Sequence, residues 1–282
     1  MRRGTNVLNA GLIEVDILRV TNSLGKFEFN GGTFSVKSTT HSNALEVGDG
    51  VSSATFFLAG NGTHSFGSSL LVHDKATLTG NGTIGNSGFF TIVLDGGTLS
   101  PGASIGKMTF TSTLVLLGKV FLEISKNGTA LTNDQVQTSS GLSYGGDLVV
   151  TNLGPTALAA GNKFKLFDAP FFTDSFLSVT LPPLAPGLNW TNTLTLDGSI
   201  QVVGIPLPVF ASISVSGTNV IISGTNGPPN APYAVLTATN VTLPLSNWVS
   251  IATNQFDSSG SFSFTNGIVS GELQRYFRIR TP

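Results

Sequence analysis

The sequence contains no cysteine and little charge. The absence of cysteine among the 282 residues excludes disulfides, thiol catalysis and zinc–thiolate sites. Only 10% of the residues are charged, against roughly 25% in an average soluble domain, and the formal net charge is −1. Such a chain has no electrostatic footprint for nucleic acid, so we expect no nucleic-acid partner.

Long apolar runs and helical periodicity are also missing. No apolar run reaches the roughly 18 residues of a membrane helix, so we expect a chain that does not span a membrane. The start, MRRGTNVLNAGLIEVDILRV, has two arginines but lacks the apolar segment of a complete signal peptide. Apolar residues nevertheless make up 40% of the chain, including 20 phenylalanines, which argues against disorder and supplies a core.

The sequence shows instead the alternation of half-buried β-strands. Apolar and polar residues alternate in LIEVDILRV (12–20) and in GKFEFNGGTFSVKS (25–38), and Gly-Gly or Asn-Gly pairs separate the segments. Phe27 and Phe29 share one face of their segment. The pattern predicts an all-β protein.

Several segments repeat at a fixed spacing. GNGT recurs after 20 residues inside two longer similar segments, ATFFLAGNGTHSFG (54–67) and ATLTGNGTIGNSG (76–88), and NGGTF (30–34) returns as DGGTL (95–99). A period near 20 fits one rung of a parallel β-helix, which is a solenoid of three strands of about five residues and three corners. An antiparallel sandwich has the same strand texture, but the fixed spacing favours the solenoid.

The stretch DGGTLSPGASIG (95–106) is open to three interpretations: a phosphate-binding loop, a calcium loop or a solenoid corner. It lacks the lysine and following helix of a phosphate loop, and the spaced carboxylates of a calcium loop. Its glycines suit a tight turn. We therefore predict a solenoid corner, with Leu99 and Ile105 pointing into the core.

The strand pattern continues over residues 119–203 with one interruption. Alternation persists through residues 119–150, and 160–169 and 194–203 are predicted as further strands. LPPLAPGLNW is too rich in proline for a central strand. It predicts an excursion from the solenoid near residues 170–192, in which Trp190 covers an apolar surface.

A proline-flanked segment, GIPLPVF (204–210), predicts a linker between two domains. Residues 1–203 before it form the predicted parallel β-helix. After it, short strands with turn signals every 8–12 residues predict a small antiparallel β-sandwich over residues 211–282.

LTGNGTIG and LDGGTLSPGASIGKMTF together resemble the autotransporter-associated β-strand repeat, also called the passenger-associated transport repeat. The later segment TNDQVQTSSGLSYGGDLVV (132–150) is similar to the run that often follows this repeat, and the resemblance covers roughly residues 54–203. The tail of the chain resembles a C-terminal β module of large exported bacterial repeat proteins. The matching positions are Gly80, Gly82, Ile84, Gly85, Gly96, Gly97, Thr98, Leu99, Pro101, Gly102, Ser104 and Gly106.

This resemblance implies a secreted or cell-surface β-helical passenger whose leader lies outside this chain. The implied role is structural or adhesive, without enzymatic activity and without cofactors. As partners we expect surface polysaccharide or another cell-surface protein, and end-to-end or side-by-side self-association. The alternative is a carbohydrate-binding or polysaccharide-degrading β-helix.

The acidic residues give little support to the alternative of a polysaccharide-degrading enzyme. Lyases and hydrolases on β-helices need clustered carboxylates beside a Lys or Arg. Asp49, Asp74 and Asp95 are separated by 25 and 21 residues, a spacing that places Asp74 and Asp95 on one face of a 20-residue rung. We expect each to cap a turn, and we assign no catalytic, metal or cofactor residue.

The remaining polar and aromatic candidates also favour structural roles. Three histidines, His41, His64 and His73, are enough to ligate a metal, but no metal-ligand spacing joins them, and we expect them to be solvent-exposed loop residues. DSSGS (257–261) is predicted as a hairpin turn rather than a calcium loop. Trp190 and Trp248 are predicted to fill cores, although exposed tryptophans would suit polysaccharide. Three arginines, Arg275, Arg278 and Arg280, are predicted to lie on a solvated edge strand.

Overall fold

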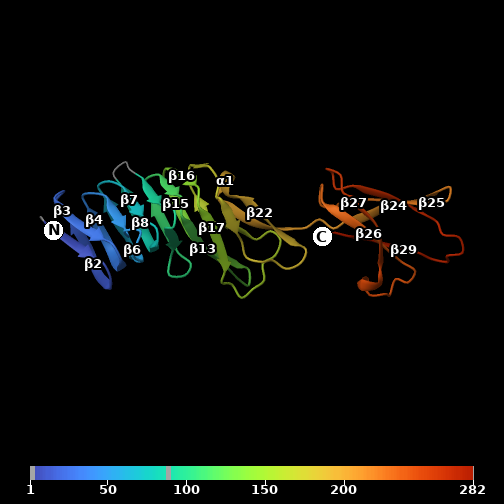
Figure 1. Ribbon diagram of the computed structural model, residues 1–282, viewed down its shortest axis with the longest axis horizontal. Helices are drawn as coiled ribbons and strands as arrows, with labels where there is room; N and C mark the ends of the chain where they lie inside the picture. Colours follow the sequence, from blue (N-terminus) through green and yellow to red (C-terminus); the bar gives the residue numbers. More distant parts are fainter. Residues whose placement is uncertain (1–3, 87–89, 282) are drawn as a thin grey trace. The chain divides into compact units, whose positions relative to one another are not determined.

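The computed structural model describes residues 4–86 and 90–281. The chain divides into two compact units, Met1–Val203 and Gly204–Pro282. The first is a parallel β-solenoid and the second consists of small antiparallel sheets, which confirms the predicted fold class (Figure 1). Ser87 and Gly88, the end of the predicted repeat 76–88, lie outside the described residues.

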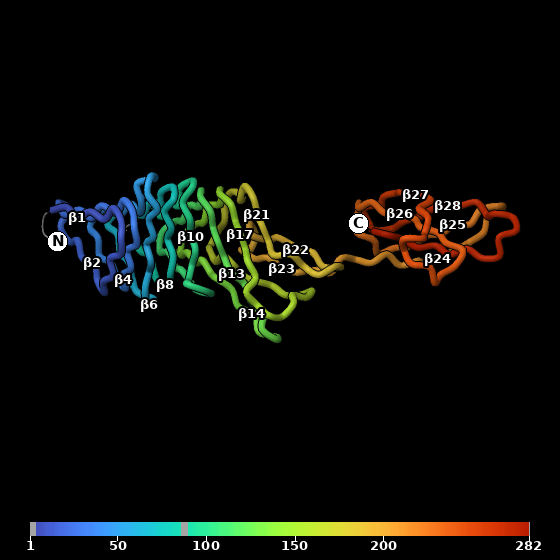
Figure 2. The backbone as a smooth tube through the Cα atoms, turned by 60° about the horizontal axis from the view of Figure 1, so that its bottom comes forward, coloured from blue at the N-terminus to red at the C-terminus, as the bar shows by residue number. Residues whose placement is uncertain are grey.

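One face of the solenoid is a sheet of eight short parallel strands. Figure 2 shows the successive turns of the backbone stacked along the solenoid. In spatial order the eight strands are β1 (Gly4–Leu8), β3 (Gly25–Phe29), β5 (Leu45–Val47), β7 (Leu70–Val72), β9 (Thr91–Val93), β12 (Leu114–Leu116), β16 (Gly141–Tyr144) and β20 (Phe171–Thr173).

In the early rungs, the part of the chain outside this sheet forms one long strand that bends at a corner. In the later rungs, the same part forms two separate strands. The long strands are β2 (Leu12–Val20), β4 (Gly32–His41), β6 (Ala54–Phe66) and β8 (Ala76–Asn86). The first half of β8 pairs with β10 (Thr98–Pro101), followed by β13 (Lys119–Asn127), β17 (Asp147–Asn152) and β21 (Ser178–Thr180). Its second half pairs with β11 (Lys107–Phe110), followed by β15 (Gln135–Thr138) and β19 (Phe167–Asp168).

The residues that repeat in the sequence pair with one another in neighbouring strands. Gly62 and Thr63 of the first GNGT pair with Gly82 and Thr83 of the second. Inward side chains stack on similar ones at successive rungs, so the core is one continuous column. Phe34 and Phe56 stack with their ring planes 8° apart and their centroids 5.7 Å apart. In order along one column lie Ile13, Phe34, Phe56, Leu78, Leu99, Val120, Leu148 and Val179.

The stretch 95–106 is a corner, a strand and a second corner. Gly96 adopts a φ of +75°, and a Cβ there would lie 2.0 Å from Asp74 Oδ1, so only glycine fits the first corner. β10 follows, and its Leu99 is fully buried as predicted. Gly102 and the residues after it form the second corner. The prediction for Ile105 is wrong, because this residue lies in that bend and is only half-buried.

The C-terminal end of the solenoid is covered by a small three-stranded sheet. It contains β18 (Lys163–Lys165), β23 (Ser199–Gly204) and β22 (Leu188–Thr193) in that order, and the one-turn helix α1 (Leu194–Asp197) joins β22 to β23. The Tyr144 hydroxyl donates a hydrogen bond to the Leu194 carbonyl oxygen, 3.1 Å away. Trp190 packs on the core, with its ring centroid 6.4 Å from that of Phe164, as predicted.

Three sequence expectations for this unit need correction. The excursion does not begin near 170, because β20 and β21 still form solenoid rungs. Residues 194–197 form a helix and not a strand, since Thr193 and Ser199 bind the Asp197 carboxylate and close the turn. The segment 119–150 also contains an antiparallel hairpin, in which β14 (Ala130–Asn133) pairs with the end of β13.

The second unit has two antiparallel sheets of three strands each. One has the order β24 (Val209–Ser216), β25 (Asn219–Thr225) and β28 (Phe262–Gly267); the other has the order β27 (Val249–Gln255), β26 (Pro232–Ala238) and β29 (Tyr276–Arg280). A 3₁₀ turn spans Leu245–Asn247. The last two residues of the predicted linker, Val209 and Phe210, already belong to β24. Tyr233, Val235, Phe256 and Phe262 are among the residues of the shared core.

The column of stacked side chains predicts a large difference between two adjacent phenylalanines. Phe56 is fully buried in the column, whereas Phe57 faces outward and is half-buried. We expect Phe56→Ala to lower the free energy of unfolding by about 3–5 kcal/mol. The control Phe57→Ala should cost about 1 kcal/mol, because it leaves no enclosed cavity. Urea denaturation followed by circular dichroism measures both, and equal losses would contradict the stacked core.

Candidate functional site

A polar concavity of the solenoid lies beside β3 and β5. Among the described residues these two strands pair only through Phe29 and Val47, whereas β1 and β3 share five pairs. A groove of about 510 Å³ lies along them. Its lining includes Lys26, Glu28, Asn30, His41, Asn43, Glu46 and Asp49. None of the sequence motifs predicted this groove, because it results from a gap in strand pairing.

Two carboxylates of this groove, Asp49 and Glu46, have different surroundings. Asp49 accepts hydrogen bonds from the backbone N–H groups of Val51 and Ser52, at 2.8 and 2.9 Å, and these bonds lower its pKa. Glu46 lies 3.3 Å from Nε2 of His73 on the next rung. Within residues 4–86 and 90–281, no three His, Asp or Glu side chains come close enough to hold a metal ion. The groove therefore offers hydrogen bonds and charge rather than a metal centre.

The predicted acidic candidates are mainly turn residues. Asp49 caps its turn as predicted. Asp74 and Asp95 occupy neighbouring corners, since Asp74 lies against Gly96 and the Lys75 amide donates to the Gly96 carbonyl oxygen. The predicted alignment of these two residues on one side of the solenoid is therefore observed. Both are exposed on convex turns, which gives a substrate no enclosure.

The prediction of solvent-exposed loop histidines is wrong for two of the three. His64 is fully buried in β6 and its Nδ1 lies 3.1 Å from the Thr39 hydroxyl. His41 ends β4 with 3% exposure, and its Nδ1 contacts the Asn43 backbone. Burial lowers the pKa of both, that of His64 to about 4. Their inward positions in the strand alternation were the signal for this burial.

Asp134 is a buried carboxyl that the sequence reasoning missed. It is fully buried, and its two oxygens accept the amide hydrogens of Gly106 and Glu123, each at 2.7 Å. Burial raises its pKa to about 7, although the two hydrogen bonds oppose this shift. Asp134 thereby fastens the corner after β10 to β13. Its role is structural, because no solvent reaches it.

The remaining candidates lie apart from this groove. The Asp257 carboxylate accepts hydrogen bonds from the backbone N–H groups of Ser259 and Ser261, and these bonds close a turn. Hydrogen bonds from Ser259 and Ser261 also lower the pKa of Asp257. The turn is not a hairpin, because β27 and β28 belong to different sheets. The Trp248 indole donates to the Leu243 carbonyl oxygen and closes a loop. Arg275, Arg278 and Arg280 lie in or next to the edge strand β29, as predicted.

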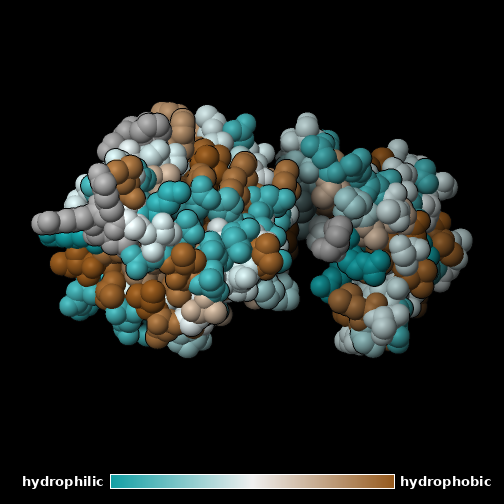
Figure 3. Space-filling model, turned by 60° about the vertical axis from the view of Figure 1, so that its left-hand side comes forward, coloured by the Kyte–Doolittle hydropathy of each residue, from teal (hydrophilic) through white to brown (hydrophobic). Residues whose placement is uncertain are grey.

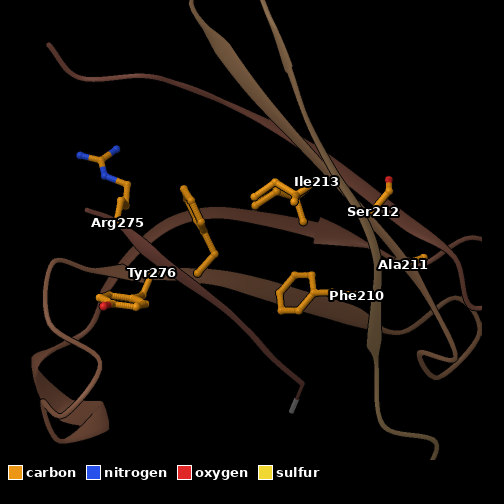
Figure 4. Close-up of a pocket in the computed structure, with 8 residues that line it drawn as sticks. Phe210, Ala211, Ser212, Ile213, Arg275 and Tyr276 are labelled. Atoms are coloured by element: carbon orange, nitrogen blue, oxygen red, sulfur yellow. The ribbon is translucent and has the colours of Figure 1, made fainter. Parts of the chain in front are cut away.

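A second, apolar groove of about 370 Å³ opens in the second unit. Phe210, Ile213 and Tyr276 surround it, and Arg275 lies at its rim (Figure 4). The Arg275 guanidinium forms an ion pair with Glu272 at 2.7 Å. The groove is thus apolar, with its adjacent positive charge partly neutralised.

Comparison with known proteins does not assign either groove. No protein-family model matches this chain, and no curated protein matches it. Among the described residues, no helix is long and apolar enough to cross a membrane.

The buried His64 and Asp134 predict opposite pH dependences of stability. His64 has a lowered pKa, so its contribution is present above pH 6.5 and is lost as the pH falls toward 4. Asp134 has a raised pKa, so its contribution is present below pH 3.8 and is lost as the pH rises toward 7. Each shift corresponds to about 3–4 kcal/mol, and His41 adds to the effect of His64.

Two variants separate these contributions. Between pH 4 and about 6.5, the stability of the His41→Leu, His64→Leu variant should fall with rising pH, because Asp134 remains and both buried histidines are removed. The stability of Asp134→Asn should rise with pH over the same window, because the histidines remain. Urea denaturation across this range measures both slopes. Slopes of the same sign in the two variants would contradict the assignment.

Proposed function

We propose that this chain is a non-enzymatic β-solenoid segment of a secreted or cell-surface protein, with a structural or adhesive role. The observation that carries the proposal is an uncharged ladder on the outer surface of the solenoid. Thr33, Thr55, Thr77 and Thr98 pair in register on four successive rungs, and Thr63, Thr83 and Thr109 form a second ladder.

These ladders suit contact over an area rather than catalysis. Hydroxyl groups repeat at the strand spacing of about 4.8 Å, which gives an extended, flat row of hydrogen-bonding groups. Neither ladder contains an ionisable side chain that could donate or accept a proton in a reaction. The resemblance of residues 54–203 to the autotransporter-associated repeat agrees with this role.

Antibody labelling tests the location, and incubation with glycans tests the absence of catalysis. An antibody against the chain should label intact and permeabilised cells of its source equally. Incubation with polygalacturonate should release neither unsaturated nor reducing ends. Labelling only after permeabilisation would contradict a surface location, and clear turnover would contradict the non-enzymatic role.

Glycan binding is a second candidate function, favoured by the groove beside β3 and β5. Lys26 and the second amide hydrogen of Asn30 supply donors along it, and Glu28 and Glu46 supply acceptors. The Asn43 amide donates to the carbonyl oxygens of Ser23 and Gly25 and thereby shapes the groove. Polar side chains of this kind suit sugar hydroxyl groups. The carboxylates also favour a neutral or basic glycan over an acidic one.

Glycan-array binding by the whole chain tests this second function. If the groove binds, Lys26→Ala together with Glu46→Ala should weaken binding about tenfold or more, since two hydrogen-bonding groups are removed. Thr55→Ala, on the outer ladder of another face, is the matched control for the groove. Unchanged binding in the groove variant, or an equal loss in the control, would exclude this site.

A further inference from the structure

Charge is concentrated in the groove beside β3 and β5. Lys26, Glu28, Glu46 and Asp49 are four of its thirteen lining residues, whereas only 10% of the whole chain is charged. Three negative charges and one positive charge leave a net charge of −2 in the groove, against −1 for the whole chain. Figure 3 shows hydrophilic and apolar patches side by side on the solenoid near its first rungs. The charge of the groove favours a cationic ligand.

Two of these carboxylates occupy corresponding positions on neighbouring rungs. Phe29 pairs with Val47 and both are buried, so the exposed residues just before them, Glu28 and Glu46, point outward side by side. Neighbouring strands are about 4.8 Å apart, and like charges opposite each other destabilise a sheet. Glu46 lies 3.3 Å from His73 Nε2, whereas Glu28 forms no ion pair in the described part of the chain. A cation between the two carboxylates relieves their repulsion.

A second and independent observation is an unused nitrogen atom in the lining of the groove. His41 is only 3% exposed, and its Nδ1 lies 3.1 Å from the Asn43 backbone oxygen. Its Nε2 is buried and has no hydrogen-bond partner among the described residues. A buried polar atom without a partner is costly. Since an imidazole nitrogen donates or accepts according to its tautomer, a hydroxyl group of a ligand suits it in either form.

The size and the polar lining of the groove suit a small organic ligand better than a bare ion. Its volume of about 510 Å³ lies within the usual range for small-molecule sites, roughly 300–1,000 Å³. No three His, Asp or Glu side chains of the described residues come close enough to hold a metal ion. Burial lowers the pKa of His41 and keeps its ring neutral, so it does not repel a cation. Lys26 and Asn30 supply donors for hydroxyl groups.

We propose that this groove binds an amino sugar whose ammonium group lies between the carboxylates of Glu28 and Glu46. Its hydroxyl groups form hydrogen bonds with His41 Nε2, Lys26 and Asn30. The inference rests on the glycan-binding candidate above, and it narrows the ligand from any neutral or basic glycan to one with a free primary amine. An ammonium group that donates to two carboxylates forms charge-assisted hydrogen bonds, which a neutral sugar lacks.

Isothermal titration calorimetry of the whole chain with two matched sugars tests the proposal. A glucosamine tetrasaccharide has free amines, and an N-acetylglucosamine tetrasaccharide has the same backbone with uncharged amides. At about pH 7 an amine similar to an α-amino group is mostly protonated. We expect the glucosamine tetrasaccharide to bind about fivefold more tightly or better. Added salt should reduce this preference, because both carboxylates are exposed.

Neutralising the carboxylate pair tests where the ammonium group lies. Glu28→Gln with Glu46→Gln should remove the preference and leave the two tetrasaccharides with similar affinities, since the amide oxygens still accept hydrogen bonds from the sugar. Glu14→Gln with Asp16→Asn removes the same charge from exposed positions of β2, in the other sheet. This matched control should keep the preference of the wild type.

Substitution of His41 tests the buried nitrogen. His41 pairs with Phe66 of the next rung, which is fully buried, so the column accepts an aromatic ring at this position. His41→Phe should weaken the binding of both tetrasaccharides by a similar factor of about three or more, because one hydrogen bond is lost and the carboxylates remain. Circular dichroism of each variant verifies that a loss of binding is not a loss of fold.

The results separate failure of this inference from failure of glycan binding. Equal affinities of the wild type for the two tetrasaccharides, or a preference that survives in the Glu28→Gln, Glu46→Gln variant, would overturn the inference and leave the glycan-binding candidate standing. No binding of either sugar would overturn both. Nα-acetyl-lysine amide supplies an ammonium group without sugar hydroxyls, and calcium chloride supplies a bare cation. If either probe binds as tightly as the glucosamine tetrasaccharide, the assignment to an amino sugar is wrong.

Discussion

The stacking of each rung on the one before it is the interaction on which the solenoid depends. Parallel pairing sets side chains of neighbouring rungs about 4.8 Å apart, so each position must tolerate its own kind above and below. Phe34 on Phe56 and Thr55 on Thr77 satisfy this requirement inside and outside the wall. A column of like charges would repel itself at this spacing, so charged residues are disfavoured in the rungs. This explains why a chain with a sizeable core has only 10% charged residues.

The corners carry the second constraint. In β6 and β8 the bend is made within the GNG run, and both Gly60 and Gly80 have positive φ. In the next rung the bend expands into the loop from Gly102 to Gly106, anchored by two hydrogen bonds between the backbones of Gly80 and Gly102. One continuous strand thereby becomes the separate strands β10 and β11. Asp134 then holds the expanded corner from inside the wall.

The repeats and alternation were sufficient to predict the class of fold, the strand at 12–20 and the inward position of Leu99. They did not predict features that depend on contacts distant in sequence. The helix at 194–197 has strand-like residues but is closed by Asp197, and His64 is buried because Thr39 and Phe56 surround it. The groove beside β3 was invisible in the sequence for the same reason, since it follows from strand pairing that is incomplete.

The rungs differ in length without any change in the column they share. Gly4 pairs with Gly25, Lys119 with Asp147, and Asp147 with Ser178, so the chain returns to the same position after 21, 28 and 31 residues. The longer rungs place their additional residues outside the wall, as in the hairpin of β14. The core column therefore gains one position for each complete rung, whatever the length of the loops outside that rung. Evolution can alter the outer loops of such a protein freely, while its interior can grow or shrink only by a complete rung.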